Sequence, residues 1–429
     1  MLVSFLLRGS WKAQRANRMR ICLVSQEYPP ETPWGGIGTQ TWLKANGLTA
    51  RGHEVHVLTC SDFATPKLRT ETHDGVVVHR LQPPGHDFAV YERQAYWVGY
   101  SWQVFRHLQE LIEQQPFDVI DFPEFAAEGY CYLLDRNVYN FCPIVVHLHG
   151  SLAMFTEHMG WPERGTRLHQ AGSFMERFCV QRADALCANS QATAQIASTY
   201  CGVAEQSIDI VHCGVDADQF SANSRQEDPE QPTILFVGAM VHNKGPEILL
   251  EAALKLRTKY PRLKLSMVGN DDKPLADEMK DRVRAAGAEA NVTFHGFVPL
   301  NELPNYYRRA SIFCSPAEFE GGTASVYLEA MACGCPPVVS TAGGGVEAVL
   351  HGETGLLVPP KDVDATAAAL DRLLSDEPMR QRMGVAGRER IENYFSRDRF
   401  IDRMLQTYEK GIAHGNGLLT RMRKLEGLE

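Results

Sequence analysis

The sequence predicts an α/β protein made of two doubly wound, Rossmann-like units. Short apolar segments alternate with longer segments of helical periodicity, which is the pattern of parallel strands covered by helices on both faces. This alternation runs along the chain twice, with a polar stretch between the two runs. The length of 429 residues suits two or three domains. Since such units hold ligands at the carboxyl ends of their strands, we expect the two units to face each other across a cleft.

The first unit is predicted over residues 19–216. It begins with an apolar strand at 20–25, which a glycine-rich turn connects to a helix over 39–50. Val55 and Val57 alternate with polar residues in the next strand, at 54–59, as expected for a half-buried strand. Further short strands are expected at 76–80, 118–121, 144–147, 185–188 and 208–212.

A polar segment separates the two units. Residues 217–232 are rich in Asp, Glu, Gln and Ser, contain two prolines and lack an apolar period, so they predict an interdomain linker. The second unit follows over residues 233–394. Its strands are expected at 233–237, 264–268, 292–295, 312–314, 337–339 and 355–358, and two of its helices at 245–259 and 277–286.

The two ends of the chain are expected to stand apart from the units. The apolar start has its charges after it, which makes a poor secretory signal, and a good strand begins only near Met19. Residues 1–18 are therefore predicted to be a disordered or non-native start. An amphipathic helix is expected over 395–412, followed by a frayed tail over 413–429.

Charge and composition exclude several classes of function. The net charge is −9 and no long basic run is present, which argues against a nucleic-acid partner. No apolar stretch reaches the length of about 18 residues that a membrane span needs. The 11 cysteines are scattered, as in reduced cytosolic proteins. We therefore expect a cytoplasmic protein. The close pair Cys333 and Cys335 lacks the second pair that a zinc site needs.

The most informative segment begins at Ser315. It places acidic residues and the turn Gly321-Gly322 just ahead of an apolar helix that contains Glu329. A glycine-rich turn at a helix N-terminus offers backbone N–H groups and a positive dipole end to an anion. Carboxylates beside it can accept hydrogen bonds from sugar hydroxyls. Anion and sugar together suggest a nucleotide sugar. The alternative is an ordinary helix start with one solvated glutamate.

Eight further motifs occur in a fixed order around this segment. They are Tyr28-Pro-Pro-Glu with Gly35-Gly-Ile-Gly, His147-Leu-His-Gly, Ala188-Asn-Ser, Val211-His-Cys-Gly-Val-Asp, Phe236-Val-Gly-Ala-Met-Val-His-Asn-Lys-Gly, Val268-Gly, His295-Gly-Phe-Val, and Gly352-Glu-Thr-Gly-Leu-Leu-Val-Pro. With these motifs the chain resembles the GT-B glycosyltransferases, in particular the retaining glycosyltransferase family 4, also called glycosyl transferases group 1.

The resemblance implies an activity and a division of labour. A hexose would move from a nucleoside-diphosphate sugar to an acceptor hydroxyl with retention of the anomeric configuration. The C-terminal domain would hold the donor and the N-terminal domain most of the acceptor, and the final helix would cross back to the N-terminal domain. No cofactor is expected beyond the donor substrate, and no metal site is assigned, because Asp271-Asp272 reads as a loop.

The resemblance assigns several residues of the second unit to binding of the donor. Lys244, together with Gly238, is expected at the diphosphate. The family often has an arginine where this chain has Ala239, so one expected cation is missing. Either Arg308 or Arg309 replaces it, or Lys244 and backbone amides suffice.

Two carboxylates are expected at the ribose and the donor sugar. Glu329 is expected to accept hydrogen bonds from the ribose hydroxyls, because its two oxygens match two adjacent donors. Glu320 is expected near the donor sugar, although it lies one residue farther from Glu329 than the family pattern has it. Glu318 is the alternative for this second role.

The loop and the base contact complete the predicted donor site. Gly321, Gly322 and Thr323 would present N–H groups to the sugar or the β-phosphate. Phe297 would lie against the base, with packing in the core as its alternative.

In the first unit, His149 is expected at the donor sugar as a catalytic group, with His147 as its competitor. Gly35, Gly36 and Gly38 would let the backbone approach the diphosphate or the donor sugar. Glu124 is placed where acceptor contacts are expected.

The acceptor itself is left open. The leading expectation is a glycan or lipid-linked acceptor in polysaccharide or glycolipid biosynthesis. One alternative is a small-acceptor synthase of the sucrose or trehalose type, and another is a catalytically inactive nucleotide-sugar-binding protein. The aromatic and basic residues of 91–112 could make peripheral contact with the inner membrane face, although such stripes more often pack in a core.

Overall fold

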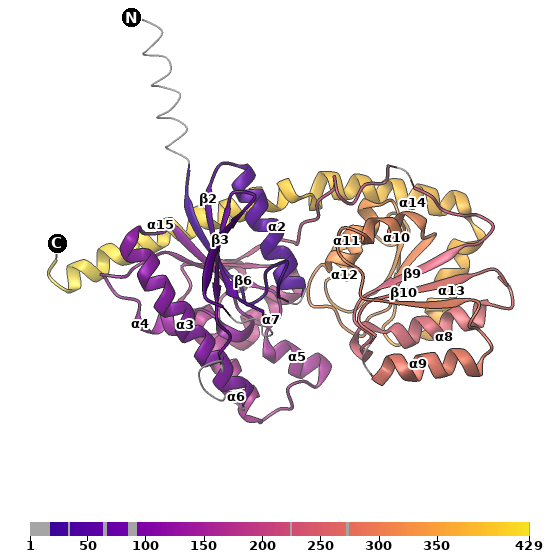
Figure 1. Ribbon diagram of the computed structural model, residues 1–429, viewed down its shortest axis with the longest axis horizontal. Helices are drawn as coiled ribbons and strands as arrows, with labels where there is room; N and C mark the ends of the chain where they lie inside the picture. Colours follow the sequence, from indigo (N-terminus) through magenta and orange to yellow (C-terminus); the bar gives the residue numbers. More distant parts are fainter. Residues whose placement is uncertain are drawn as a thin grey trace, which may run out of the picture. The chain divides into compact units, whose positions relative to one another are not determined.

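The computed structural model describes residues 18–32, 35–62, 67–84, 92–223, 225–271 and 274–428. The chain forms two compact units (Figure 1). The first contains residues 1–188, 194–211 and 401–429, and the second contains residues 189–193 and 212–400. The predicted start over 1–18 lies outside the described residues except for Arg18.

The first unit is built on an eight-stranded sheet in the order β3-β4-β2-β1-β5-β6-β7-β8. All pairs are parallel except that of β3 with β4, which is antiparallel. The strand β3 was not predicted, and it makes the sheet mixed rather than purely parallel. The strands are β1 (Arg20–Val24), β2 (Glu54–Cys60), β3 (Arg69–His73), β4 (Val76–Leu81), β5 (Val119–Pro123), β6 (Ile144–Leu148), β7 (Ala185–Ala188) and β8 (Ile208–Ile210).

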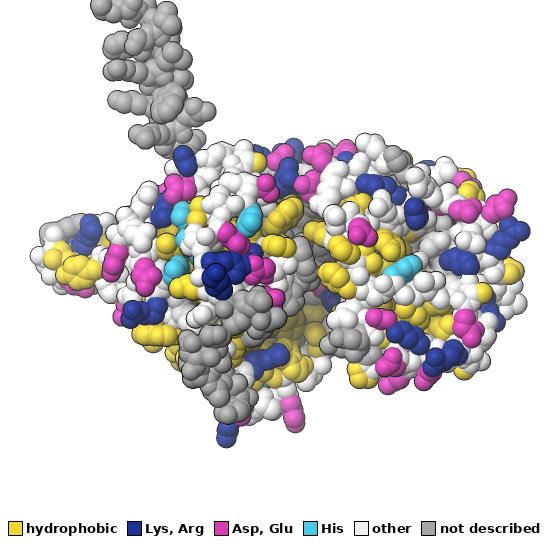
Figure 2. Space-filling model, viewed as in Figure 1, with side chains coloured by type: hydrophobic (Ala, Val, Ile, Leu, Met, Phe, Trp, Pro, Cys, Tyr) yellow, Lys and Arg dark blue, Asp and Glu magenta, His cyan; other side chains and the backbone are white. Residues whose placement is uncertain are grey.

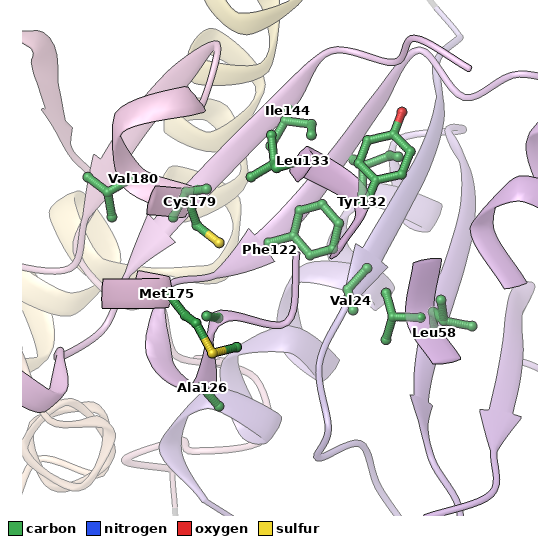
Figure 3. Packing of buried hydrophobic residues seen from close by; sticks show 14 of the residues in the cluster. Val24, Leu58, Phe122, Ala126, Tyr132, Leu133, Ile144, Met175, Cys179 and Val180 are labelled. Carbon is green, nitrogen blue, oxygen red and sulfur yellow. The ribbon is translucent and has the colours of Figure 1, made fainter. Parts of the chain in front are cut away.

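Helices connect these strands and cover the sheet. They are α2 (Gly36–Ala50), α3 (Arg93–Gln114), η1 (Phe125–Ala127), α4 (Tyr130–Asp135), α5 (Leu152–Met159), α6 (Arg167–Arg182), α7 (Gln191–Cys201) and η2 (Glu205–Ser207). One sheet face packs against α3, α4 and α6 through a continuous apolar core (Figure 3). In this core Val24 of β1, Phe122 of β5 and Ile144 of β6 meet Tyr132 of α4 and Met175 of α6.

The membrane-contact prediction concerned the stretch that became α3. Trp97 and Phe105 are buried in the core, whereas Trp102 is 51% exposed. Tyr91 lies outside the described residues. Among the described residues, no helix is both long and apolar enough to cross a membrane. Figure 2 shows acidic and basic side chains interspersed on one face of the molecule.

The second unit is a six-stranded, wholly parallel sheet in the order β11-β10-β9-β12-β13-β14. Its strands are β9 (Thr233–Val237), β10 (Lys264–Val268), β11 (Val292–Gly296), β12 (Ile312–Ser315), β13 (Pro337–Ser340) and β14 (Leu356–Val358). Its helices are η3 (His242–Lys244), α8 (Pro246–Leu256), α9 (Pro274–Ala285), α10 (Leu303–Arg309), α11 (Ser325–Ala332), α12 (Gly345–Ala348), α13 (Val363–Ser375), α14 (Glu377–Arg390) and η4 (Ile391–Phe395). The prediction of two doubly wound α/β units is confirmed.

The predicted linker is part of the second unit. Phe220 is buried in an apolar cluster with residues of α10 and α11. Arg225 donates to the carbonyl of Ala310 and pairs with Glu227, which in turn pairs with Arg380 of α14. These contacts fix the segment, so it does not behave as a free polar connection.

The last helix is longer than predicted. It is α15, from Arg397 to Leu425, drawn in yellow in Figure 1, and it covers most of the tail that was expected to fray. Three glycines lie inside it, and two of them, Gly411 and Gly415, pack against other parts of the first unit. A Cβ atom on Gly411 would lie 3.0 Å from Val145, and one on Gly415 would lie 3.0 Å from Pro143. Packing therefore sustains a helix that two glycines would otherwise weaken.

Candidate functional site

The predicted donor residues gather at the topological switch point of the second sheet. Strand order reverses between β9 and β12, so the chain leaves these neighbouring strands in opposite directions. In doubly wound sheets, ligands commonly bind at the carboxyl ends of the strands on either side of such a point. The loop after β9 contains Gly238 and Lys244, and the loop after β12 contains Glu318 and Glu320. Residues separated by 76 positions in the chain thus come into contact at this edge.

Lys244 and Glu320 form an ion pair between these two loops. The Lys244 Nζ lies 2.5 Å from Glu320 Oε2, with the two side chains 32% and 19% exposed. Gly245 makes this approach possible, because it has φ of +67° and a Cβ there would lie 2.3 Å from the Pro316 carbonyl oxygen. The result is an accessible cation held by a carboxylate at the strand ends.

Glu318 has a different environment from that of Glu320. Its carboxylate pairs with Lys361, 3.0 Å away and 65% exposed, and its backbone N–H donates to the Asn243 carbonyl. Of the two candidates for the first carboxylate, Glu320 is therefore the one paired with Lys244.

The Gly321–Thr323 loop is buried and held from two sides. Gly344 N donates to the Glu320 carbonyl at 2.7 Å, and Gly343 approaches the same carbonyl so closely that a Cβ would lie 1.8 Å from the oxygen. On the other side, the Gly321 carbonyl accepts hydrogen bonds from the hydroxyls of Ser190 and Thr193.

The segment Asn189–Thr193 begins with two residues of the Ala188-Asn-Ser motif, Asn189 and Ser190, and it received no role in the sequence analysis. It packs with the second unit, and a Cβ on Gly322 would lie 2.3 Å from the Asn189 side-chain nitrogen. Gly322 is thus packed closely against the Asn189 side chain, whatever its part in ligand binding.

Glu329 projects from α11 into a buried setting. It is 5% exposed, and its Oε2 accepts a hydrogen bond from Tyr307 Oη at 2.8 Å. Burial raises the pKa of Glu329 to about 7, while the Tyr307 hydrogen bond acts in the opposite direction. Tyr307 was not anticipated from the sequence, because it belongs to α10 and lies 22 residues away.

Glycines also join the ends of β9, β10 and β11. Gly238 N donates to the Val268 carbonyl, and Gly269 N donates to the Gly296 carbonyl, both at 2.9 Å. A Cβ on Gly269 would lie 1.9 Å from the Gly238 carbonyl oxygen. Phe297, the next residue after Gly296, is 59% exposed, so core packing, the alternative to base contact, does not describe it.

The missing cation at Ala239 is not replaced by Arg308. Ala239 is exposed, and Arg308 donates to the backbone carbonyls of Ser221 and Gln219. Arg308 therefore fixes the segment before β9, within the second unit. Arg309 is exposed at the end of α10.

In the first unit, the end of β6 presents His149. Its backbone N–H donates to Glu124 Oε2 at 2.6 Å, and Gly150 N donates to the other oxygen of the same carboxylate. Burial, helped by the charge of Lys44, lowers the pKa of His149 to about 3, so its imidazole is neutral at physiological pH. His147, its competitor, is 1% exposed and belongs to the interior.

Both carboxylate oxygens of Glu124 thus accept hydrogen bonds from backbone amides. The carboxyl group is buried, and burial raises its pKa to about 7 while the amides of His149 and Gly150 oppose that rise. The residue therefore shapes the turn after β6, and the acceptor contact expected from the sequence stays a prediction.

The glycine-rich turn before α2 encloses a carboxylate. Glu27 Oε2 accepts from Gly35 N at 2.9 Å, and a Cβ on Gly35 or Gly38 would lie 2.2 Å or 2.8 Å from atoms of Glu27. A Cβ placed on Gly36 would have no neighbouring atom within 4 Å. Gly35 and Gly38 are therefore glycines because Glu27 fills the space beneath them, a neighbour that the sequence analysis missed. Pro33 and Trp34 of this turn lie outside the described residues.

The described part of the chain contains no cluster of three His, Cys, Asp or Glu side chains able to hold a metal ion. Asp271 pairs with Lys280 at 2.7 Å, and Asp272 lies outside the described residues.

The two doubly wound units are those of a GT-B glycosyltransferase, and comparison with known proteins agrees. The family profile described as glycosyl transferases group 1 matches residues 218–390. The profile described as glycosyltransferase family 4 matches residues 34–219. The chain belongs to this glycosyltransferase family, as its motifs predicted.

Three relatives illustrate the range of the likeness. An uncharacterized glycosyltransferase of Methanocaldococcus jannaschii is 25% identical over 404 residues, covering 91% of this chain and 98% of that protein. A GDP-mannose-dependent alpha-(1-6)-phosphatidylinositol monomannoside mannosyltransferase of Mycolicibacterium smegmatis is 34% identical over 189 residues, covering 41% of this chain and 49% of that protein. The structure of a sucrose-phosphate synthase from Thermosynechococcus elongatus has a TM-score of 0.78 at 23% identity, covering 92% and 100%, which shows a shared fold.

Proposed function

We propose that this glycosyltransferase moves a hexose from a nucleoside-diphosphate sugar to an acceptor hydroxyl with retention of configuration, in polysaccharide or glycolipid biosynthesis. The observation that carries the proposal is the pair of Lys244 and Glu320 at the switch point of the second unit, 2.5 Å apart and partly exposed. A cation and a carboxylate side by side suit a diphosphate joined to a sugar.

The second unit would hold the donor. Lys244 would neutralise the charge that builds on the diphosphate as it leaves, and Glu320 would accept hydrogen bonds from the hexose hydroxyls. Glu329 would accept from the ribose hydroxyls. The N-terminus of α11 adds a positive dipole end, since its N-cap residue, Ala324, supplies no side-chain hydrogen bond.

The chemical step needs no separate base. The bond between the anomeric carbon and the phosphate oxygen would break as the acceptor oxygen bonds to the same face of that carbon. The acceptor proton would pass to the departing phosphate oxygen. Neutral His149 would hydrogen-bond to a hydroxyl of the transferred sugar without adding charge beside the developing cation. The GDP-mannose dependence named for the mannosyltransferase relative supports a nucleotide-sugar donor.

The test is nucleotide binding, measured as the melting temperature with UDP, GDP, ADP and dTDP. One of them should raise it, since a ligand at 100 times its dissociation constant adds about 2.7 kcal/mol of stability. Glu329→Gln should weaken that binding about tenfold, because a charged hydrogen-bond acceptor is lost. Glu128→Gln, which changes an equally buried acid of the first unit, should leave the affinity unchanged.

Two results would contradict the proposal. The first is no rise with any of the four nucleotides for a folded protein. The second is equal weakening by both substitutions, which would mean that Glu329 acts through stability alone.

A further inference from the structure

We propose that Tyr408, on the C-terminal helix α15, is a positioning residue for His149, acting through the buried side chains of Asp121, Lys44 and His147. The inference rests on the proposed function for the role of His149 in transfer. The chain of contacts itself lies wholly within the first unit.

The first link joins two helices to one strand. The Tyr408 hydroxyl donates to Asp121 Oδ2 at 2.5 Å, and Lys44 Nζ lies 2.6 Å from the same oxygen. Asp121 belongs to β5, Lys44 to α2 and Tyr408 to α15, and none of the three is more than 3% exposed. A buried carboxylate needs every available donor, so the phenol and the ammonium stabilise it together.

The second link fixes the state of a histidine. Lys44 Nζ lies 3.2 Å from Nδ1 of His147. A lysine ammonium can only donate, so Nδ1 of His147 must accept, and its proton lies on Nε2 when the ring is neutral. Burial first, and then the electrostatic influence of the His149 ring and of the Lys44 ammonium, hold the pKa of His147 well below its usual range.

The third link reaches the predicted site. The rings of His147 and His149 have centroids 4.1 Å apart and planes at 34°. Glu124 holds the backbone of His149 from one side, while the His147 ring forms the surface against which the His149 ring lies. A shift of Lys44 toward or away from Asp121 would therefore move the ring that supports His149.

The seating of α15 explains why Tyr408 can make this contact. Gly411 rests on Val145 and Ala185, so the helix lies directly against β6 and β7. Thr407 and Lys410 bond instead to Asp209, at 2.9 Å and 2.6 Å, and these docking contacts lie outside the histidine network. The helix begins at Arg397 in the second unit and continues in the first. Tyr408, the residue that we propose positions the His149 ring, thus belongs to an element shared by both units.

The experiment compares Tyr408→Phe with Thr407→Val. Each removes one hydroxyl that donates from α15 to a carboxylate, but only the first touches the network. In protein labelled with 15N-histidine, the long-range 1H–15N spectrum reports the tautomer and environment of each ring. Tyr408→Phe should shift the signals of His147 and His149, and Thr407→Val should leave both unchanged. Assignment would use His149→Gln.

Turnover provides a second readout, as nucleotide release from UDP-glucose, ADP-glucose and GDP-mannose with a crude acceptor extract. Tyr408→Phe should lower kcat about tenfold while the nucleotide dissociation constant stays within about twofold, since positioning acts on the reacting geometry. Thr407→Val should change neither by more than about twofold. Asp121→Asn, similar in shape, serves as a second variant should Tyr408→Phe fold poorly, and it should also shift both histidine signals.

Unchanged histidine signals in Tyr408→Phe, or equal changes in both α15 variants, would overturn the inference. The spectrum needs no substrate, so a failure of the proposed transfer reaction would appear as absent turnover beside an intact histidine response.

Discussion

Two glutamates separated by one residue have different electrostatic partners in the second unit. Glu320 pairs with Lys244, whereas Glu318 pairs with Lys361, a side chain that is 65% exposed. Both are loop residues of the same type, so neither composition nor helical periodicity distinguishes them. Their partners do, because Lys244 follows β9 at the switch point and Lys361 follows β14.

We predict that Glu320→Gln and Glu318→Gln will separate in activity. Glu320→Gln should lower kcat/KM by about 100-fold or more, the size seen when a preorganised polar contact at a reacting centre is removed. Glu318→Gln should stay within about threefold, since an exposed ion pair contributes at most about 1 kcal/mol. Nucleotide release from the preferred sugar nucleotide is the measurement. Equal losses in the two variants would show that the assignment of Glu320 is wrong.

At the scale of elements, short turns decide where the site residues point. The turn from η3 into α8 passes through Gly245, at φ of +67°, which lies against the backbone at Pro316. Gly352 has a similar conformation, at φ of +82°, but nothing lies within 4 Å of its Cβ position. Both glycines have a backbone conformation that strains other residues, but only Gly245 has atoms close to where a Cβ would lie. Comparing the two positions therefore separates the cost of backbone strain from the cost of a steric clash.

Gly245→Ala is predicted to cost more stability than Gly352→Ala. Gly352→Ala should lower the free energy of unfolding by about 1–2 kcal/mol, the cost of a side chain in the left-handed region. Gly245→Ala should exceed that value, because the Pro316 carbonyl must also move, and it should weaken nucleotide binding by displacing Lys244. Urea unfolding and nucleotide-dependent melting measure these effects. An equal loss of stability in the two variants would mean that the Pro316 carbonyl moves away from the new side chain at no cost in free energy.

At the scale of the whole molecule, buried carboxyl groups link stability to pH. Burial raises the pKa of Glu124 and Glu329 to about 7, of Glu128 to about 8, and of Glu176 well above its usual value. Each group binds its proton more tightly when folded than when unfolded. As pH rises past the unfolded pKa, near 4.5, the unfolded chain releases protons that the folded chain still holds. These groups therefore destabilise the fold progressively until the folded pKa is reached.

Glu128 offers a test of this linkage. We expect wild type to lose stability relative to Glu128→Gln as pH rises from about 5 to about 8, by up to several kcal/mol, since each pKa unit corresponds to about 1.4 kcal/mol. Glutamine keeps the oxygen that accepts from Gln26 N. Urea unfolding at a series of pH values is the measurement.

Glu113→Gln is the control, because it alters an exposed acid of α3, and the pH dependence should then match wild type. A Glu128→Gln variant with the wild-type pH dependence would mean that Glu128 is ionised in the folded protein throughout this range.

Elements with a strong local pattern were predictable, and those without one were not. The strands at 185–188, 233–237 and 264–268 were predicted with the bounds they have, because apolar runs between turn residues specify buried strands. β3 was missed because it is polar and largely exposed, and it is held by its pairing with β4. The end of α15 was misplaced because its support comes from β6 and Pro143 rather than from its own residues.

The sequence by itself determined the doubly wound fold, the family and the short set of residues that we propose to contact a nucleotide sugar. These follow from periodicity, turn chemistry and motif order, all of which depend on residues a few positions apart. Tertiary structure alone decided the partners: Glu27 under Gly35 and Gly38, Tyr307 on Glu329, and Tyr408 on Asp121 across 287 positions of the chain. Such contacts depend on how strands and helices pack in space, and no local pattern in the chain specifies them.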